Sequence, residues 1–500
     1  MKKYQYKLLH VSFIALLLLQ IAPSSWATSG SAGKTVFAET KLATIPVNFL
    51  GIIPFEKEFV LASVNDNGQQ CITFNGKQGP GFDAIAADSI VYNVETKHLL
   101  YVAQKGDKKL VVNNGIPGKE YDGIGEGTLV MSQDSKHIAY AASEYDKWMV
   151  VIDEKAQPMY DLIGGAPVFS PDGNHIAYAV QNNEKWLAII DGKTGPQFDG
   201  IGGIMYSADS NQVAYMGMKG EKYCVVRNGQ VSPEYDGFGG MLFSPDGKKF
   251  AYTAKKGDKW SCYVNDEPLQ EYEMITEASI IFSPDSKRLA YVVFQNNKLS
   301  VVLDNEPGPE VDVIGTVPFF SPDSKHIVYI AKTNGKQVIV YDQKVSEAYE
   351  GIGGNSLLFS PDSKHLLYGV KKGNKWHVVL DGKAGKEYDQ IGGLTYSPDS
   401  KNLVYFAGVD GKFTIVLNGT EKGKYEKILN TPIFSNDSQH VAFFASEGNK
   451  SFLVIDGQEG TKYDKMICGV TATDDNGFEA IALRDKVIYR INCKTSSKNP

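Results

Sequence analysis

The sequence predicts an all-β protein, a β-propeller built from about twelve four-stranded blades. A unit of 37 to 40 residues repeats along almost the whole chain, and each copy reads as four short strands separated by turns. A lone sheet of this kind exposes both faces, so it needs copies beside it to bury a core. The composition agrees, because 50 glycines and 27 tyrosines are typical of a turn-rich β protein.

The clearest copy covers residues 359–393 and the strand that leads into it. A Ser-Pro-Asp-Ser turn at residues 360–363 follows its first strand. The dipeptide Asp381-Gly382 is one that a type I′ hairpin favours, since both central residues of that turn need positive φ. The strands that we expect here are 357–359, 365–370, 376–380 and 387–393.

Each copy can be aligned on one residue of its second strand, usually a tyrosine. Twelve copies at so regular a step leave no room for an inserted domain. These aligned residues are Leu61, Tyr101, Tyr140, Tyr178, Tyr215, Tyr252, Tyr291, Tyr329, Tyr368, Tyr405, Phe443 and Leu483.

The number of rings is not marked in the sequence. Propellers usually close with four to eight blades. Two six-bladed rings over residues 45–276 and 277–494 therefore fit best, and the alternatives are a division into seven plus five blades or one large ring.

The two ends of the chain depart from the repeat. Residues 1–27 have a basic start, a short apolar run and small residues before a cleavage point, so they are predicted to be a secretory signal peptide. Residues 28–44 form a polar segment whose strand-like piece, 35–38, is a candidate to supply the missing fourth strand of the last copy. Residues 495–500 form a C-terminal tail.

The repeat resembles the WD40-like or TolB-like β-propeller repeat of the PD40 type. In that family a strand ends in Phe-Ser-Pro-Asp-Gly and is followed by a strand ending in Ala-Tyr. Here residues 282–291 read Phe-Ser-Pro-Asp-Ser-Lys-Arg-Leu-Ala-Tyr. The resemblance covers about residues 45–494 and implies the fold, whereas function does not follow because this repeat serves many proteins.

Charge and cysteine content limit the function classes. Cleavage of the signal peptide removes three lysines and takes the formal net charge from −7 to −10, so we expect no nucleic-acid partner. No stretch after the signal peptide is long and apolar enough for a membrane span. Five cysteines are few for an exported protein of this size, and Cys468 with Cys493 is the pair we favour for a disulfide.

Most residues that resemble site residues obey the repeat, which favours a structural role. Histidines at one shared position would lie in separate blades, too far apart to share a metal ion. The tryptophans at the start of the third strands and the Ser-Pro-Asp aspartates are repeated in the same way. We therefore assign no catalytic, cofactor-binding or metal-binding residue. The shared histidines are His98, His137, His175, His326, His365 and His440.

The turns between second and third strands vary in an informative way. In this fold they lie on the same face as the joints between blades, and here they are rich in lysine. We interpret them as a candidate interaction rim, formed by Lys105, Lys108, Lys147, Lys185, Lys219, Lys222, Lys256, Lys259, Lys336, Lys372 and Lys375.

These features predict an exported, periplasmic or extracellular, non-catalytic binding or scaffold protein. It would use one propeller face to contact a protein or a glycan, without a cofactor. The alternative is a propeller enzyme of glycan lyase, hydrolase or lactonase type with its site at a ring mouth. The first strands that would line that mouth read mostly as small or apolar residues, which disfavours the enzyme. Function through the size of the array alone is a third hypothesis.

Overall fold

Each sequence repeat folds into one antiparallel sheet whose turns use the residues that the sequence predicts. The structure is a computed structural model and describes residues 35–495. In the copy at residues 359–393 the third and fourth strands pair through Leu380 and Lys383. The turn between them places Asp381 at φ 48 and Gly382 at φ 78, as a type I′ turn requires.

The described chain forms twelve such sheets. In several blades the innermost strand is interrupted in its middle and forms two short strands, both paired with the second strand of the blade. The first three blades contain β2 (Phe49–Pro54), β3 (Phe59–Val64), β4 (Gln70–Phe74) and β5 (Lys77–Gln78); β6 (Ala84–Asn93), β7 (His98–Lys105), β8 (Lys108–Asn113) and β9 (Ile116–Pro117); and β10 (Gly123–Ile124), β11 (Val130–Met131), β12 (Ile138–Glu144), β13 (Lys147–Ile152) and β14 (Lys155–Ala156). Blades four to six contain β15 (Leu162–Ile163), β16 (Val168–Phe169), β17 (Ile176–Asn182), β18 (Lys185–Ile190) and β19 (Lys193–Phe198); β20 (Gly200–Tyr206), β21 (Val213–Lys219), β22 (Lys222–Arg227) and β23 (Gln230–Val231); and β24 (Gly237–Phe243), β25 (Phe250–Lys256), β26 (Lys259–Val264) and β27 (Glu267–Tyr272).

The second half of the chain continues the same order. Blades seven to nine contain β28 (Met274–Ile275), β29 (Ile281–Phe282), β30 (Leu289–Gln295), β31 (Lys298–Leu303) and β32 (Glu306–Pro307); β33 (Val313–Ile314), β34 (Phe319–Phe320), β35 (Ile327–Thr333), β36 (Lys336–Tyr341) and β37 (Lys344–Val345); and β38 (Gly351–Ile352), β39 (Leu358–Phe359), β40 (Leu366–Lys372), β41 (Lys375–Leu380) and β42 (Lys383–Tyr388). The last three contain β43 (Gln390–Tyr396), β44 (Leu403–Val409), β45 (Lys412–Leu417) and β46 (Thr420–Tyr425); β47 (Lys427–Ile428), β48 (Ile433–Phe434), β49 (Val441–Glu447), β50 (Lys450–Ile455) and β51 (Gln458–Glu459); and β52 (Lys465–Met466), β53 (Thr471–Ala472), β54 (Phe478–Arg484), β55 (Val487–Lys494) and β1 (Val36–Thr44).

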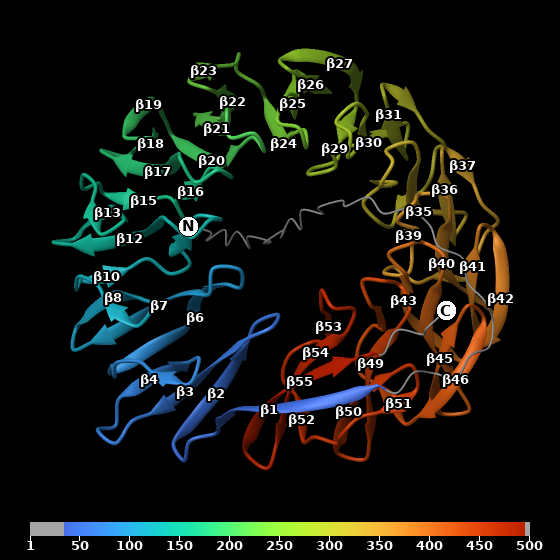
Figure 1. The fold of residues 1–500 in the computed structure, drawn as a ribbon. Helices are drawn as coiled ribbons and strands as arrows, with labels where there is room; N and C mark the ends of the chain where they lie inside the picture. The colour runs from blue at the N-terminus through green and yellow to red at the C-terminus, as the bar shows by residue number, and fades with distance from the viewer. Residues whose placement is uncertain (1–34, 496–500) are drawn as a thin grey trace.

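The blades follow one another in a single ring, with inner strands such as β20 and β24 nearest its centre and outer strands such as β42 and β46 at its perimeter (Figure 1). The strand β1 closes this ring. It pairs antiparallel with β55, from Val36 opposite Lys494 to Thr44 opposite Val487, and becomes the outermost strand of the last blade. The expectation that the N-terminal segment supplies the missing strand is therefore confirmed, and the strand extends beyond the predicted residues 35–38.

The favoured division into two six-bladed rings is corrected by this closure. A hydrophobic cluster joins Leu61 of the first blade to Cys468 and Ile481 of the last. Another cluster crosses the expected boundary at residue 276, where Tyr272 and Tyr291 meet edge to face with ring centroids 6.3 Å apart. Because blades six and seven pack as other neighbours do and the first and last described strands, β1 and β55, pair in one blade, the single large ring is the form adopted.

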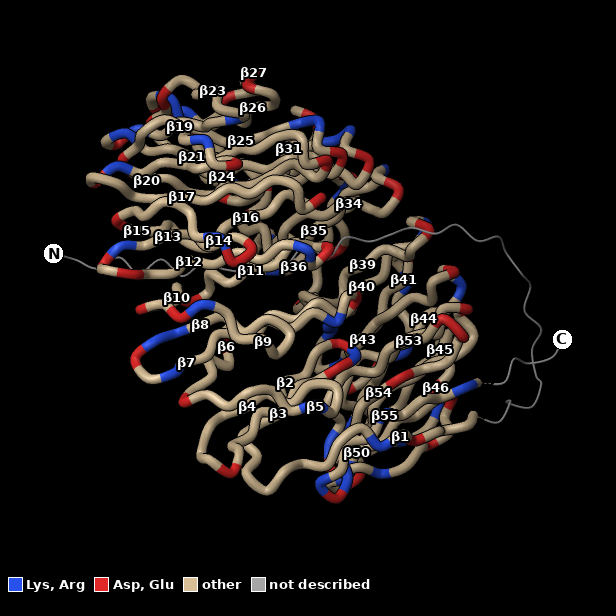
Figure 2. Tube along the Cα trace, turned by 60° about the vertical axis from the view of Figure 1, so that its left-hand side comes forward, with Lys and Arg blue, Asp and Glu red and all other residues tan. Residues whose placement is uncertain are grey.

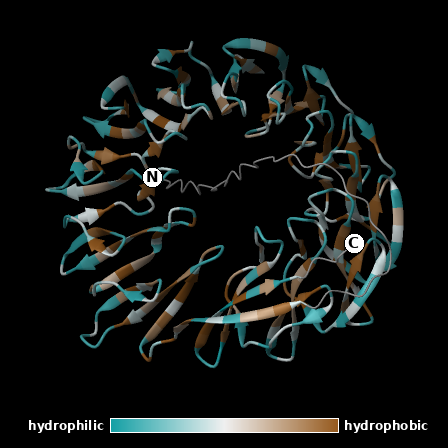
Figure 3. Cartoon of the chain, viewed as in Figure 1, coloured by the Kyte–Doolittle hydropathy of each residue, from teal (hydrophilic) through white to brown (hydrophobic). Residues whose placement is uncertain are grey.

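The core lies between neighbouring blades. The aligned tyrosines of the second strands are buried, and most of them receive the edge of an aromatic ring from the preceding blade, as Tyr368 does from Tyr349 at 6.2 Å. Hydrophobic residues follow the strands while hydrophilic residues occupy the turns (Figure 3). The repeat therefore builds one interface many times, and each blade is stabilised chiefly by its two neighbours.

Candidate functional site

The predicted rim lies at one edge of each blade, in the turns between the second and third strands. We call these turns the rim hairpins, and we call the segments that connect one blade to the next the blade joints. All eleven predicted rim lysines are exposed. Their surroundings differ from blade to blade, which the sequence pattern did not show.

A blade-joint aspartate holds most rim hairpins together in a cross-blade clip. Asp312 accepts a hydrogen bond from Lys298 Nζ of blade seven at 2.5 Å. Its other carboxylate oxygen accepts the backbone N–H of Asn334 in blade eight at 2.7 Å. The bond with Lys298 lowers the pKa of Asp312 and raises that of the lysine.

The same clip recurs at seven blade joints. In each, one carboxylate oxygen accepts a lysine ammonium and the other accepts a backbone N–H of the next rim hairpin. These lysines have a structural role in joining blades. The pairs are Lys108–Asp122, Lys147–Asp161, Lys185–Asp199, Lys222–Asp236, Lys298–Asp312, Lys375–Asp389 and Lys450–Asp464.

Three lysines at the same repeat position form no ion pair within residues 35–495. They are Lys259, Lys336 and Lys412, and the blade joint next to each carries a glutamate in place of the aspartate. Glu426 still accepts the N–H of Gly448 at 2.7 Å without meeting the lysine, because an added methylene displaces its carboxylate. The predicted rim did not include Lys412. The glutamate that replaces aspartate in the neighbouring blade joint, Glu426, is the sequence feature that marks this lysine as unpaired.

A second lysine occupies some rim hairpins and is also partly neutralised. Lys105 contacts Glu120 at 2.8 Å, Lys372 contacts Glu347 at 3.0 Å, and Lys219 lies 3.9 Å from Glu234. Lys256 has no such partner in the described chain. The rim cations without an ion pair in the described chain therefore lie on blades six, eight and ten. Figure 2 shows basic and acidic segments together in the loops around the ring rather than on separate faces.

The Ser-Pro-Asp turns at the other edge of the blades are structural. Asp362 accepts the hydroxyl of Ser360 at 2.7 Å and the N–H of Lys364 at 3.2 Å. Ser363, the last residue of the turn, has a positive φ of 63°. Its hydroxyl oxygen accepts a hydrogen bond from the backbone N–H of Asp323 in the preceding blade at 2.9 Å. These bonds explain why the turn recurs without any need for catalysis.

The shared histidines are held singly and apart. His137, His175, His326, His365 and His440 each place Nδ1 within 2.7 Å of an aspartate of their own blade, and His98 lies 2.6 Å from Asn113. No group of three His, Cys, Asp or Glu side chains in the described chain is placed to hold a metal ion.

The inner strands carry few charges at the points where they bulge toward the ring centre. The exposed carboxylates at these bulges are Asp88, Glu126 and Glu277, on blades two, three and seven. Their neighbours are mostly glycine, alanine and other small residues. Two of the tryptophans pack against glycines in the inner strand of their own blade, since a Cβ on Gly164 would lie 2.6 Å from the ring of Trp186 and one on Gly237 would lie 3.2 Å from the ring of Trp260.

The disulfide that the sequence favoured is not formed. Cys468 and Cys493 are both free and buried. Cys468 faces the first blade and lies 3.4 Å from the carbonyl oxygen of Glu58, whereas Cys493 packs in the cluster shared with blade eleven. The two thiols point to opposite sides of the last blade, so proximity in the sequence misled the prediction.

No helix able to cross a membrane occurs in residues 35–495. The predicted signal peptide, residues 1–27, lies outside the described residues.

Comparisons with known proteins give structural likenesses only. Neither protein-family models nor curated proteins match the sequence. Among solved structures, TolB from Acinetobacter baumannii is similar at 14% identity and TM-score 0.24, over 59% of this chain and 79% of that one. The computationally designed Ika8 protein shares 19% identity at TM-score 0.26, over 58% and 96%. The β-propeller domain of Cps50 (Swd1) from Myceliophteria thermophila shares 9% at TM-score 0.25, over 59% and 99%.

Proposed function

We propose that this chain is an exported, non-catalytic binding protein whose rim hairpins contact an acidic protein or glycan. The observation that supports this most directly is the unequal state of the rim lysines. Seven joints neutralise their lysine in a clip, whereas Lys256, Lys259, Lys336 and Lys412 are exposed and form no ion pair within the described chain.

Unpaired ammonium groups favour a partner of opposite charge. A clipped lysine would have to break a hydrogen bond before it could bind a new carboxylate, and a free lysine does not. Because the chain is negatively charged overall, these unpaired lysines on blades six, eight and ten are local positive charges on an acidic molecule. The proposal also includes membership of the PD40-type repeat group and a periplasmic or extracellular location.

The experiment is a pull-down from cell-envelope extract with the mature protein, followed by titration of the purified partner. A first variant replaces Lys259, Lys336 and Lys412 with glutamine. A matched control replaces the clipped Lys147, Lys185 and Lys222, which removes the same charge from the same edge of the ring. We expect the first variant to lose binding and the control to lose thermal stability while binding is retained.

A variant with unchanged net charge tests whether binding depends on unpaired lysines or only on the number of lysines. Glu273→Asp, Glu350→Asp and Glu426→Asp together should form the missing clips and weaken binding, although every lysine remains. Equal binding by all variants would refute the role of the rim. Absence of any partner together with turnover of a glycan or lactone panel would refute the binding function itself.

A further inference from the structure

The perimeter of the ring contains a second kind of site, at one repeated position between neighbouring blades. After the outer hairpin the chain turns back, and its N–H bonds the third-strand carbonyl seven residues earlier. In seven of the blades this turn residue is Gly79, Gly118, Gln157, Ser232, Gly308, Ser346 or Gly460. We call the space beside it the perimeter groove.

A side chain from the next blade fills the perimeter groove at three of these places. A Cβ on Gly118 would lie 3.1 Å from Oε2 of Glu154, and one on Gly308 would lie 3.4 Å from Oε1 of Gln343. At the last blade the filler is Phe37 of β1, whose ring would lie 2.9 Å from a Cβ on Gly460. Glycine is needed at the turn because the filler occupies the room of a side chain.

The filler is lost at two other places. Asp266 stands where Glu154 and Gln343 stand, but it turns away to pair with Arg227 at 2.5 Å. Gly382 occupies the same hairpin position and has no side chain. A groove is open at both places, with a volume of about 370 Å³ between blades five and six and about 480 Å³ between blades eight and nine.

The two open grooves have matching walls. Val231 and Val345 line them and are 42% and 45% exposed. Ser232 and Ser346 accept the third-strand N–H groups of Val225 and Ile339, both at 2.9 Å. A buried tyrosine, Tyr252 or Tyr368, forms the floor of each groove and bonds the tyrosine hydroxyl of the preceding blade.

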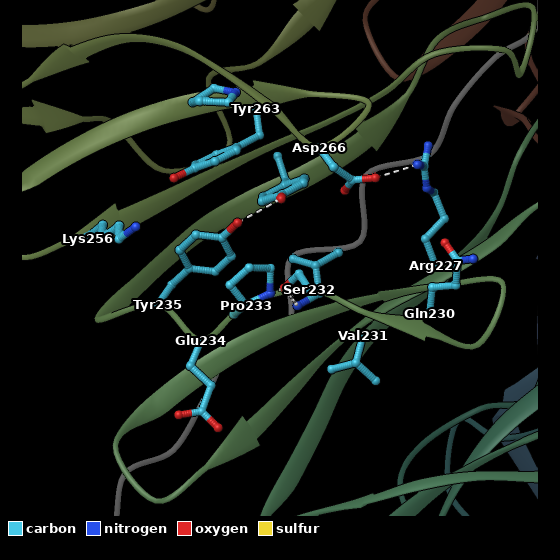
Figure 4. A pocket seen from close by; sticks show the side chains of 13 residues that line it. Arg227, Gln230, Val231, Ser232, Pro233, Glu234, Tyr235, Lys256, Tyr263 and Asp266 are labelled. Carbon is cyan, nitrogen blue, oxygen red and sulfur yellow. Dashed lines mark hydrogen bonds and ion pairs between the residues drawn. The ribbon is translucent and has the colours of Figure 1, made fainter.

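Each groove is lined by one lysine that has no ion pair within the described chain. In the first groove Arg227 pairs with Asp266 and Glu234 lies 3.9 Å from Lys219, which leaves Lys256. Figure 4 shows the Arg227–Asp266 pair at one end of the first groove and Lys256 at the other. In the second groove Asp381 is held by His365, while Lys344 has no ion pair within the described residues. Each groove thus combines apolar and aromatic walls with one unpaired ammonium group.

We propose that the two open grooves each accept an aromatic side chain from an extended, acidic peptide segment of a partner protein. The occupant is argued from the last blade, where an extended strand inserts the ring of Phe37 into the equivalent groove. An aromatic ring matches the tyrosine floor, and neighbouring carboxylates would pair with Lys256 or Lys344. This site lies on the perimeter and goes beyond the function proposed for the rim.

The test uses the mature protein and a labelled peptide with one phenylalanine flanked by glutamates. Titration should show two equivalent sites per chain, and a peptide with alanine in place of phenylalanine should bind at least about tenfold more weakly. Ser346→Gly with Gly382→Gln copies the filled arrangement of blades seven and eight, and should leave one site. Gln343, Glu154 and Asp266 show that this hairpin position tolerates a side chain at φ 63 to 73.

Two further variants complete the design. Arg227→Leu, Ser232→Gly and Asp266→Gln together should close the first groove, and both sets together should abolish binding. Gly308→Ser with Gln343→Gly should open a third groove and raise the stoichiometry to three. Melting temperatures verify folding. No detectable binding, unchanged binding after both grooves are filled, or equal binding of the alanine peptide overturns the proposal, as does binding of an anionic oligosaccharide in place of the peptide.

Discussion

The closing strand provides a quantitative test, through the replacement Glu39→Gln on β1. Glu39 accepts hydrogen bonds from Arg484 at 3.1 and 2.8 Å and from the hydroxyl of Tyr463 at 2.6 Å. The guanidinium also lies 4.6 Å from the ring centroid of Tyr489. This cluster ties the N-terminal strand to the last blade.

The magnitude follows from the exposure of the pair. The side chains of Arg484 and Glu39 are 25% and 24% exposed. A charge-assisted bond contributes about 1.5–3 kcal/mol, and residual solvent screening places this pair near the lower value, about 1.5 kcal/mol. Detachment of β1 is a local opening, so this loss should increase its open population about tenfold.

Amide hydrogen exchange of residues 36–44 is the assay, with strands of blade six as the internal reference. Glu39→Gln should exchange about tenfold faster in β1 and at an unchanged rate in the reference strands. Adding Arg484→Gln should cause little further change, because the pair is already broken. Exchange within twofold of the unaltered protein, or additive effects of the two replacements, would refute the reasoning.

The pH dependence of the closing strand has a defined sign. Burial by itself raises the pKa of Glu39, but bonds from Arg484 and Tyr463 outweigh it and lower the pKa overall. The folded pKa is thus below the unfolded value of about 4.3. The contribution is complete above that value and is lost as the pH falls through the folded pKa, so the protection factor of β1, which is corrected for the intrinsic exchange rate at each pH, should fall in acid.

Four further outcomes are expected. Tyr252→Phe removes a buried hydroxyl that is hydrogen-bonded at 2.9 Å and should lower the free energy of unfolding by about 1 kcal/mol. Tyr329→Phe removes a buried hydroxyl that has no hydrogen-bond partner in residues 35–495, so it should leave the unfolding midpoint unchanged or higher. Glu350→Asp should form a clip with Lys336 and raise the melting temperature; an unchanged value would count against the clip. The hydrogen bonds from the lysines lower the pKa of the clip aspartates, so the clips should stabilise the folded protein above about pH 4 and lose this effect in stronger acid. Melting temperatures measured over a pH series would show this. The five cysteines are buried, and burial raises the pKa of Cys262 to about 12, so they should react with a thiol reagent only after unfolding. Five thiols should then be counted, and a count of three would indicate a disulfide.

The parts of the fold that sequence reasoning predicted are local in the chain. The spacing of tyrosines such as Tyr329 and Tyr368 set the number of blades, and turns such as Asp381-Gly382 set the hairpins. Turn chemistry depends on a few adjacent residues, so it can be read directly. The repeat also explained why the histidines and Ser-Pro-Asp aspartates are structural.

The candidate sites could be predicted only in part. The sequence located the lysines of the rim hairpins, whose role in binding stays a prediction. Their division into clipped and free lysines depends on whether a carboxylate fourteen residues away reaches the ammonium, as Asp312 does for Lys298. The perimeter grooves were missed. Ser346 and Gly382 are ordinary turn residues in sequence, and only packing of adjacent blades brings them together.

The sequence by itself determined the blade, its turns and the number of copies, because each depends on contacts within one repeat of about forty residues. The tertiary structure alone decided the single ring, the closing pairing of β1 with β55, the pairing of the rim lysines and the two open grooves. All of these are contacts between blades. Their outcome depends on small differences in side-chain reach, such as aspartate against glutamate or glutamine against glycine, that have no meaning until neighbouring blades are in place.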